Sequence, residues 1–214
     1  MKNLFLAFLG PDGCGKSTIA EKVANRINKK EAGRAIVIHF RPLLLPNINE
    51  LLTGKKFEVP LDGVILPHTH PSSGYFMSLF RFFYYFFDFT VGQFVKIRPL
   101  LKSGKTVIYD RHFYDFITDP LRSRIKLPQW FFHLSIYLVP RPDFVFFFSG
   151  SPETLRQRKQ ELTLEEICRQ LKDYRALLPR LKNACEIPNE GPIDEVIEKV
   201  NSVIENHLKI PYEF

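Results

Sequence analysis

The segment Gly10-Pro-Asp-Gly-Cys-Gly-Lys-Ser-Thr18 constrains this chain more than any other feature, because it matches the phosphate-binding pattern G-x-x-x-x-G-K-[ST] completely. Its glycines allow a tight turn, so that backbone N–H groups point at phosphate oxygens. In this pattern Lys16 reaches the β- and γ-phosphates, and the Ser17 hydroxyl holds Mg²⁺. An apolar run at 4–9 precedes the loop and a helical pattern follows it, as the motif requires. The loop therefore predicts a site for ATP with Mg²⁺.

Apolar runs alternate with helical patterns along the rest of the chain. Further apolar runs lie at 35–40, 106–109, 144–148 and 184–187, and helical patterns lie at 17–30, 153–178 and 193–208. This alternation is typical of a parallel sheet with helices on both faces. We predict a single α/β domain over 1–214, with a three-layer P-loop NTPase fold and a parallel sheet of about five strands.

Asp110 and Arg111 directly follow the third apolar run. Ligands of an open parallel sheet bind beyond the carboxyl ends of its strands, so both residues should lie beside the phosphate loop. There Asp110 can help hold Mg²⁺ or accept a proton from the acceptor, and Arg111 can bind a phosphoryl group. A structural ion pair is the competing interpretation of these two residues.

Composition excludes fewer classes of function than the motifs do. The net charge is +7, but the chain has no long basic block and no zinc-finger or RNA-binding pattern, so we expect no nucleic-acid partner. Three cysteines, without close pairing, argue against a secreted disulfide framework, and we expect a cytoplasmic protein. His68 and His70 lack further ligands nearby and are weak indicators of a metal. His39 lies in an apolar run and is expected in the core.

An aromatic stretch over 75–95 has only two charged residues, Arg81 and Asp88. Its apolar side chains recur at helical spacing, at Phe80, Phe83, Tyr84, Phe87 and Val91. We expect a helix whose apolar stripe is buried or lines a substrate site. Because the charges lie inside the window, we expect no membrane span, and contact with a membrane surface stays open.

Several motifs resemble those of the thymidylate kinase family of nucleoside monophosphate kinases, and the match runs through most of the chain. Gly10-Pro-Asp-Gly13 resembles that family's G-x-[DE]-G opening, and Phe40-Arg-Pro42 resembles its R-E-P segment. Leu100, Gly104 and 107–112 resemble its L-x-x-G-x-x-V-x-x-D-R-Y block. Ser151-Pro-Glu153 followed by Arg158 is similar to its P-P-E-x-x-x-x-R segment, and Asn189-Glu-Gly191 is similar to its adenine-facing loop.

The resemblance implies transfer of the ATP γ-phosphoryl group to a nucleoside monophosphate, with dTMP the first candidate, by a protein that is a homodimer. It also implies an acceptor-side region at about 41–100 and a short lid at about 156–170. Asp12 and Arg111 would face the acceptor, Arg41 its phosphate, and Arg81 its base. Together with the loop, the candidate ATP-binding residues are Gly10, Pro11, Asp12, Gly13, Cys14, Gly15, Lys16, Ser17, Thr18, Arg158 and Asn189. The candidate catalytic residues are Lys16, Asp110, Arg111 and Asp12, and Ser17 and Asp110 are the candidate metal ligands.

Three departures from the family leave the acceptor open. Ser149 stands where the family has Asp, and the lid at 159–169 is short with few arginines between its ends. The segment 115–130 has no counterpart that we recognise, and it is either an altered acceptor site or a solvated loop. The alternatives are a P-loop kinase of a sugar, a nucleoside or a surface-glycan precursor, and a nucleotide-binding regulator that does not catalyse.

Overall fold

A computed structural model describes residues 3–46, 48–53 and 73–208 of the chain. Its centre is a parallel sheet of five strands, in the order β2-β3-β1-β4-β5. The strands are β1 (Phe5–Leu9), β2 (Ala35–His39), β3 (Thr106–Asp110), β4 (Phe144–Ser149) and β5 (Ala184–Pro188). The predicted α/β fold is confirmed, with all five strands close to their predicted positions. His68 and His70 lie outside the described residues.

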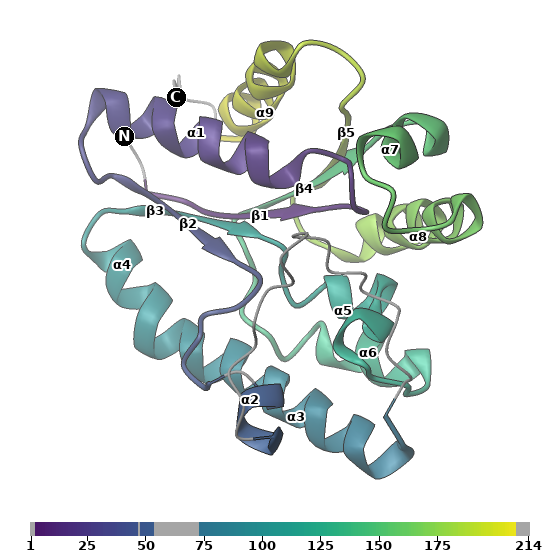
Figure 1. Ribbon diagram of the computed structural model, residues 1–214. Helices are drawn as coiled ribbons and strands as arrows, with labels where there is room; N and C mark the ends of the chain where they lie inside the picture. The colour runs from purple at the N-terminus through teal and green to yellow at the C-terminus, as the bar shows by residue number, and fades with distance from the viewer. Residues whose placement is uncertain (1–2, 47, 54–72, 209–214) are drawn as a thin grey trace.

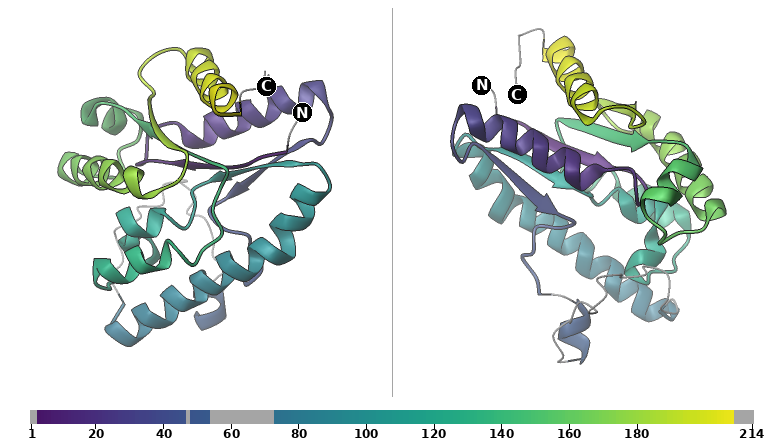
Figure 2. Two further views of the ribbon diagram at one scale, coloured as in Figure 1. Left: turned by 180° about the vertical axis from the view of Figure 1, so that it is seen from behind. Right: turned by 45° about the horizontal axis from the view of Figure 1, so that its top comes forward.

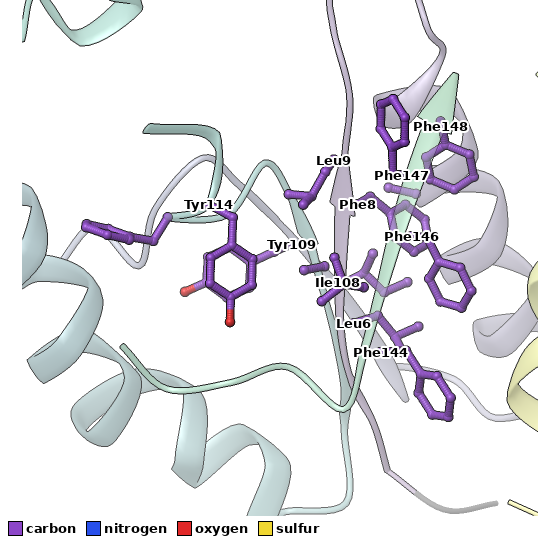
Figure 3. Packing of buried hydrophobic residues seen from close by; sticks show 14 of the residues in the cluster. Leu6, Phe8, Leu9, Ile108, Tyr109, Tyr114, Phe144, Phe146, Phe147 and Phe148 are labelled. Carbon is purple, nitrogen blue, oxygen red and sulfur yellow. The ribbon is translucent and has the colours of Figure 1, made fainter. Parts of the chain in front are cut away.

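The three central strands are buried along their whole length, as expected for a sheet with helices on both faces. Phe8 of β1 lies edge-on to Phe146 and Phe148 of β4, with ring centroids 5.7 and 5.0 Å apart. Figure 3 shows these rings and neighbouring aliphatic side chains filling the space beside the sheet. This packing fixes the carboxyl ends of β1, β3 and β4 relative to one another.

Helices cover both faces of the sheet. Helices α1 (Lys16–Lys30) and α9 (Ile193–Leu208) lie on one side, and α3 (Tyr75–Gly92) lies on the other, continued by a π-helical turn (Gln93–Ile97) and α4 (Arg98–Lys102) (Figures 1 and 2). The short α2 (Ile48–Thr53) lies on the same side of the sheet as α3. Within the described ranges, no helix has the length and apolar character needed to cross a bilayer.

The orientation of α3 differs from the expectation. The predicted stripe faces outward, with Phe80, Phe83 and Phe87 each about half exposed, whereas the two charged residues, Arg81 and Asp88, are buried. The helix is apolar almost all round, so the spacing of its apolar residues does not fix which face is inside. The face with the charged groups turns inward because those groups have partners there, as described below.

Other segments also depart from the predicted elements. The single helix expected over 153–178 is two helices, α7 (Pro152–Arg158) and α8 (Leu164–Leu177), followed by a 3₁₀ turn at Leu178–Arg180. Thr163 caps α8 by accepting a hydrogen bond from the Glu166 N–H, which starts a new helix after the break. The unmatched segment after β3 folds into α5 (Asp115–Thr118), a 3₁₀ turn (Pro120–Ser123) and α6 (Gln129–Ser135).

Candidate active site

The phosphate loop joins β1 to α1 at the carboxyl edge of the sheet. Gly13 and Gly15 both have φ of 84°, in the left-handed region that favours glycine. A Cβ on Gly13 would lie 2.3 Å from the Leu155 carbonyl oxygen, so the loop needs glycine there for space as well. Helix α1 begins at Lys16 and presents its positive N-terminal end to the loop. Sequence and geometry thus agree on an anion-binding turn.

Lys16 is almost completely buried at the centre of this turn. Its Nζ donates a hydrogen bond to the Pro11 carbonyl at 2.8 Å, and burial lowers the pKa of its ammonium group. Because this cation is held by carbonyl and thiol groups, a bound phosphate would be a stronger partner for it.

A hollow of about 400 Å³ lies over the loop. Among the described residues, its wall contains five basic side chains but only one acidic side chain, Asp12. Ser17 and Thr18 also face it. The basic residues come from four parts of the chain and are Lys16, Arg111, Arg122, Arg158 and Lys159. Such an excess of positive charge fits a ligand that carries several negative charges.

The Asp12 carboxylate is the counter-ion of this cluster. It contacts Arg111 through one oxygen and Arg122 through the other, and Lys159 Nζ lies 3.9 Å away. Asp12 and Arg111, which the resemblance assigns to the acceptor, are therefore brought together. The competing interpretation was a structural ion pair between Asp110 and Arg111; among the described residues Arg111 pairs with Asp12 instead. Arg111 has φ of 74°, a rare conformation for a residue other than glycine.

Asp110 ends β3 and pairs in register with Phe8 of β1 and His39 of β2. Its Oδ2 lies 3.0 Å from Nδ1 of His39, while its Oδ1 is buried and has no hydrogen-bond partner among the described residues. An unpartnered carboxylate oxygen beside a phosphate loop suits Mg²⁺, which prefers oxygen ligands and keeps phosphates and waters in its shell. The exposed Ser17 hydroxyl on the wall of the hollow is a second oxygen of the right kind.

The segment that follows Asp110 and Arg111 is tied to the phosphate loop. All residues from 112 to 119 are buried, so a fully solvated loop is wrong for this part. Asp115 Oδ2 accepts a hydrogen bond from the His112 N–H at 2.8 Å, and its Oδ1 contacts the Tyr174 hydroxyl. The same hydroxyl lies 3.3 Å from the Gly10 carbonyl oxygen. Burial raises the pKa of Asp115 above its ordinary value.

Two residues expected at ATP lie against the loop. Arg158, at the end of α7, donates from Nη1 to the Asn189 carbonyl at 2.9 Å and reaches the wall of the hollow although much of its side chain is exposed. Asn189 in turn donates from Nδ2 to the Cys14 carbonyl at 2.8 Å. Arg158, the phosphate loop and the loop after β5 are therefore joined by hydrogen bonds.

The two arginines expected on the acceptor side lie apart from this cluster. Arg41 borders a second hollow of about 590 Å³, which is also lined by His39 and Tyr85. Its guanidinium group forms an ion pair with buried Asp88 at 3.2 Å and lies 5.7 Å from the centre of the Tyr85 ring. Arg81 is buried on the same side, and burial lowers its pKa, which a hydrogen bond with Tyr85 partly offsets. Neither arginine lines the hollow over the phosphate loop.

Three residues of the site were not predicted from the sequence. His39 was expected in the core, but its side chain is 58% exposed and contacts Asp110. Its position directly before the Phe40-Arg-Pro42 motif, at a strand end, was the available signal. Arg122 lies in a segment without periodic patterning, whereas Lys159 falls inside the helix expected over 153–178, where the sequence did not indicate the break. The acidic and basic residues at 119–124 indicated a site only as one of two alternatives.

Comparison with known proteins gives whole-length matches, although no protein-family model matches the chain. The chain is 28% identical to the thymidylate kinase of Caenorhabditis elegans over 221 residues, which cover 96% of this chain and 91% of that protein. It is also 28% identical to a probable thymidylate kinase of Thermococcus gammatolerans over 217 residues, covering 99% and 84%.

Solved structures agree in fold. A thymidylate kinase from Ehrlichia chaffeensis superposes with a TM-score of 0.61 at 18% identity, covering 95% of this chain and all of that chain. A thymidylate kinase from Candida albicans gives 0.64 at 19% identity, covering 97% and 93%. The expected resemblance to the thymidylate kinase family and the expected P-loop fold are both confirmed.

Proposed function

We propose that this protein transfers the γ-phosphoryl group of ATP to a nucleoside monophosphate, with dTMP as the first candidate acceptor. The observation that carries this proposal is the phosphate loop with five basic side chains around one hollow, at the carboxyl edge of a parallel sheet. The whole-length similarity to proteins named thymidylate kinase supports the choice of acceptor.

The proposed mechanism relies on position and charge, because phosphoryl transfer requires little covalent chemistry from the protein. Backbone N–H groups of the loop and Lys16 hold the donor phosphates. Arg111, held by Asp12 in the free protein, turns to the phosphoryl group as charge builds up on its oxygens. Ser17 and Asp110 are the residues that would hold Mg²⁺, which neutralises phosphate charge when it is bound.

The acceptor is proposed to enter the second hollow, between β2 and α3. Arg41 lies at the wall of that hollow, and its guanidinium group can bind the phosphate of a nucleotide. Tyr85 offers a ring beside it, and the Tyr85 side chain is also hydrogen-bonded to Arg81. A phosphate here would add negative charge beside two buried arginines, of which Arg41 already pairs with the buried Asp88 carboxylate.

The test is ADP release from ATP and Mg²⁺ with dTMP, dUMP, dCMP, thymidine or no acceptor. We expect release that depends on a nucleoside monophosphate and is fastest with dTMP. ATP binding without turnover on any of these acceptors would refute the proposal and favour a regulator or a different acceptor.

A hydroxyl acceptor, such as a nucleoside or a sugar, is the second candidate, and the contact between His39 and Asp110 is the observation that favours it. The two side chains meet at 3.0 Å beside the acceptor hollow. A hydroxyl must lose a proton during transfer, and an imidazole beside a carboxylate can accept it. The phosphate of dTMP needs no such base. This candidate would be supported if ADP release were faster with thymidine than with dTMP and if the release with thymidine were lost in His39→Ala.

A homodimer is proposed through the outward face of α3 and α6. This face exposes several large apolar side chains, which a second copy of the chain would cover: Phe76, Phe80, Phe83, Phe87, Trp130 and Leu134. Sedimentation equilibrium should give a dimer that Phe83→Glu converts to a monomer, and a monomeric wild type would refute this arrangement. A cytoplasmic location and the lack of a nucleic-acid partner stay predictions.

A further inference from the structure

The phosphate hollow contains a cation that neither the loop nor the lid supplies. Arg122 lies in the 3₁₀ turn at Pro120–Ser123, after β3 and α5, yet its side chain lines the same hollow as Lys16 and Ser17. Of the lid segment, Arg158 and Lys159 line this hollow, and Lys159 pairs with Glu161 at 3.1 Å, so Arg158 is the one lid arginine at the loop. Arg122 is therefore an additional positive group at the loop.

The turn holds Arg122 in place from behind. Asp119 caps the turn by accepting a hydrogen bond from the Arg122 N–H at 3.3 Å, and its other oxygen accepts from Arg122 Nε, also at 3.3 Å. The far edge of the guanidinium group, Nη2, then contacts the Asp12 carboxylate. Asp119 is itself buried, so this anchor is fixed rather than solvated. Arg122 is thus preorganised with one edge directed at the phosphate loop.

Asp12 takes the position of an anion in this arrangement. Its two oxygens are shared by Arg111, Arg122 and the more distant Lys159, so three cations surround one carboxylate. A terminal phosphoryl group carries more negative charge and more oxygens than a carboxylate, and it therefore competes well for the arginines. Arginine suits this exchange because its planar fork binds phosphate through two donors.

We propose that Arg122 binds the phosphoryl group that is transferred, and so adds charge stabilisation from the 3₁₀ turn to that of the single lid arginine, Arg158. This inference rests on the proposed function for the identity of the reaction, but not for the binding contact itself. Arg122 stays anchored on Asp119 while Nη2 changes partner from Asp12 to the terminal phosphate of ATP. The contact is specific to that phosphate, because ADP lacks the group.

The test is calorimetric binding of ATP and of ADP, each with Mg²⁺, to Arg122→Ala, Arg122→Lys and a matched control, Arg156→Ala. Arg156 is an exposed arginine of α7 that does not line the hollow, so its loss tests the effect of net charge alone. For Arg122→Ala we expect affinity for ATP to fall by about tenfold to a hundredfold, the range for one charge-assisted hydrogen bond, with less than a threefold change for ADP. Arg122→Lys should lie in between, and Arg156→Ala should change both by less than about twofold.

Equal losses for ATP and ADP, or none, in a variant with wild-type thermal unfolding would overturn the inference. If Arg122→Ala does not fold, the ATP-to-ADP affinity ratio of Arg122→Lys decides instead. The binding measurement does not depend on turnover. If the protein binds ATP but phosphorylates no nucleotide, the proposed function is refuted. The ATP-to-ADP affinity ratios of the variants would still decide the role of Arg122. Where the acceptor is phosphorylated, Arg122→Ala should lower kcat by about a hundredfold or more, with little change in the acceptor KM.

Discussion

Replacing Asp88 with Ala should destabilise the protein strongly, because it leaves the buried Arg41 guanidinium group without its counter-ion. The Asp88 side chain is fully buried and the Arg41 side chain is 5% exposed. Asp88 accepts hydrogen bonds from Arg41 Nη1 at 3.2 Å and from the Leu45 N–H at 2.8 Å. Removing one partner of a buried ion pair costs about 3–5 kcal/mol. Arg41 keeps its bonds to the Leu45 and Pro46 carbonyls, which places the loss towards the lower end of that range.

Urea unfolding followed by circular dichroism measures this loss. Asp88→Asn keeps an oxygen acceptor for the Leu45 N–H but loses the charge, so we expect a smaller loss of about 1.5–3 kcal/mol. Asp194→Ala is the control, because it breaks the exposed ion pair with Arg26 and should cost at most about 1 kcal/mol. An Asp88→Ala protein within about 1 kcal/mol of wild type would refute the reasoning, since the buried arginine would then need no carboxylate.

Three further predictions concern other buried or partly buried groups. Burial lowers the pKa of His112 to about 3, so the stability this group contributes is present above pH 6.5 and is lost as the pH falls towards 3. His112→Phe should therefore flatten the fall in unfolding free energy between pH 6.5 and 4 by up to about 1.4 kcal/mol per pH unit, and an unchanged slope would contradict this. Gly92→Ala should lower the melting temperature despite alanine's helix preference of about 1 kcal/mol, because the new Cβ would lie 2.6 Å from Pro42 Cβ; a higher melting temperature would argue against that contact. Partial burial raises the pKa of Cys185 to about 11, so mass spectrometry should detect its alkylation by iodoacetamide only slowly below pH 10, whereas rapid labelling at pH 8 would contradict the raised pKa.

The phosphate loop and the strands around it were predictable because their signals are local. Glycines at fixed spacing specify the turn around Lys16, and continuous apolar runs specify buried strands, so the position of Asp110 at a strand end followed from its neighbours alone. The resemblance to a known family then indicated Arg158 and Asn189. Both lie against the loop in the structure.

The orientation of α3 and the position of Arg122 depend on contacts between residues far apart in the chain, which no single stretch of sequence reveals. The inward face of α3 depends on the pairing of Asp88 with Arg41, which lies 47 residues away. Arg122 reaches Asp12 across 110 residues, through a turn without helical or strand periodicity. In a helix that is apolar almost all round, an apolar stripe does not show which face packs against the core. The buried face is determined by the charged groups that find partners there.

Formation of dTDP from ATP and dTMP, measured for wild type and Lys16→Ala, tests the central claim most directly. The account predicts turnover by the wild type and a loss of at least about a hundredfold in Lys16→Ala, with an unchanged circular dichroism spectrum, because Lys16 holds the donor phosphates. Near-normal turnover in the folded Lys16→Ala protein, or no product from a wild type that binds ATP, would contradict it.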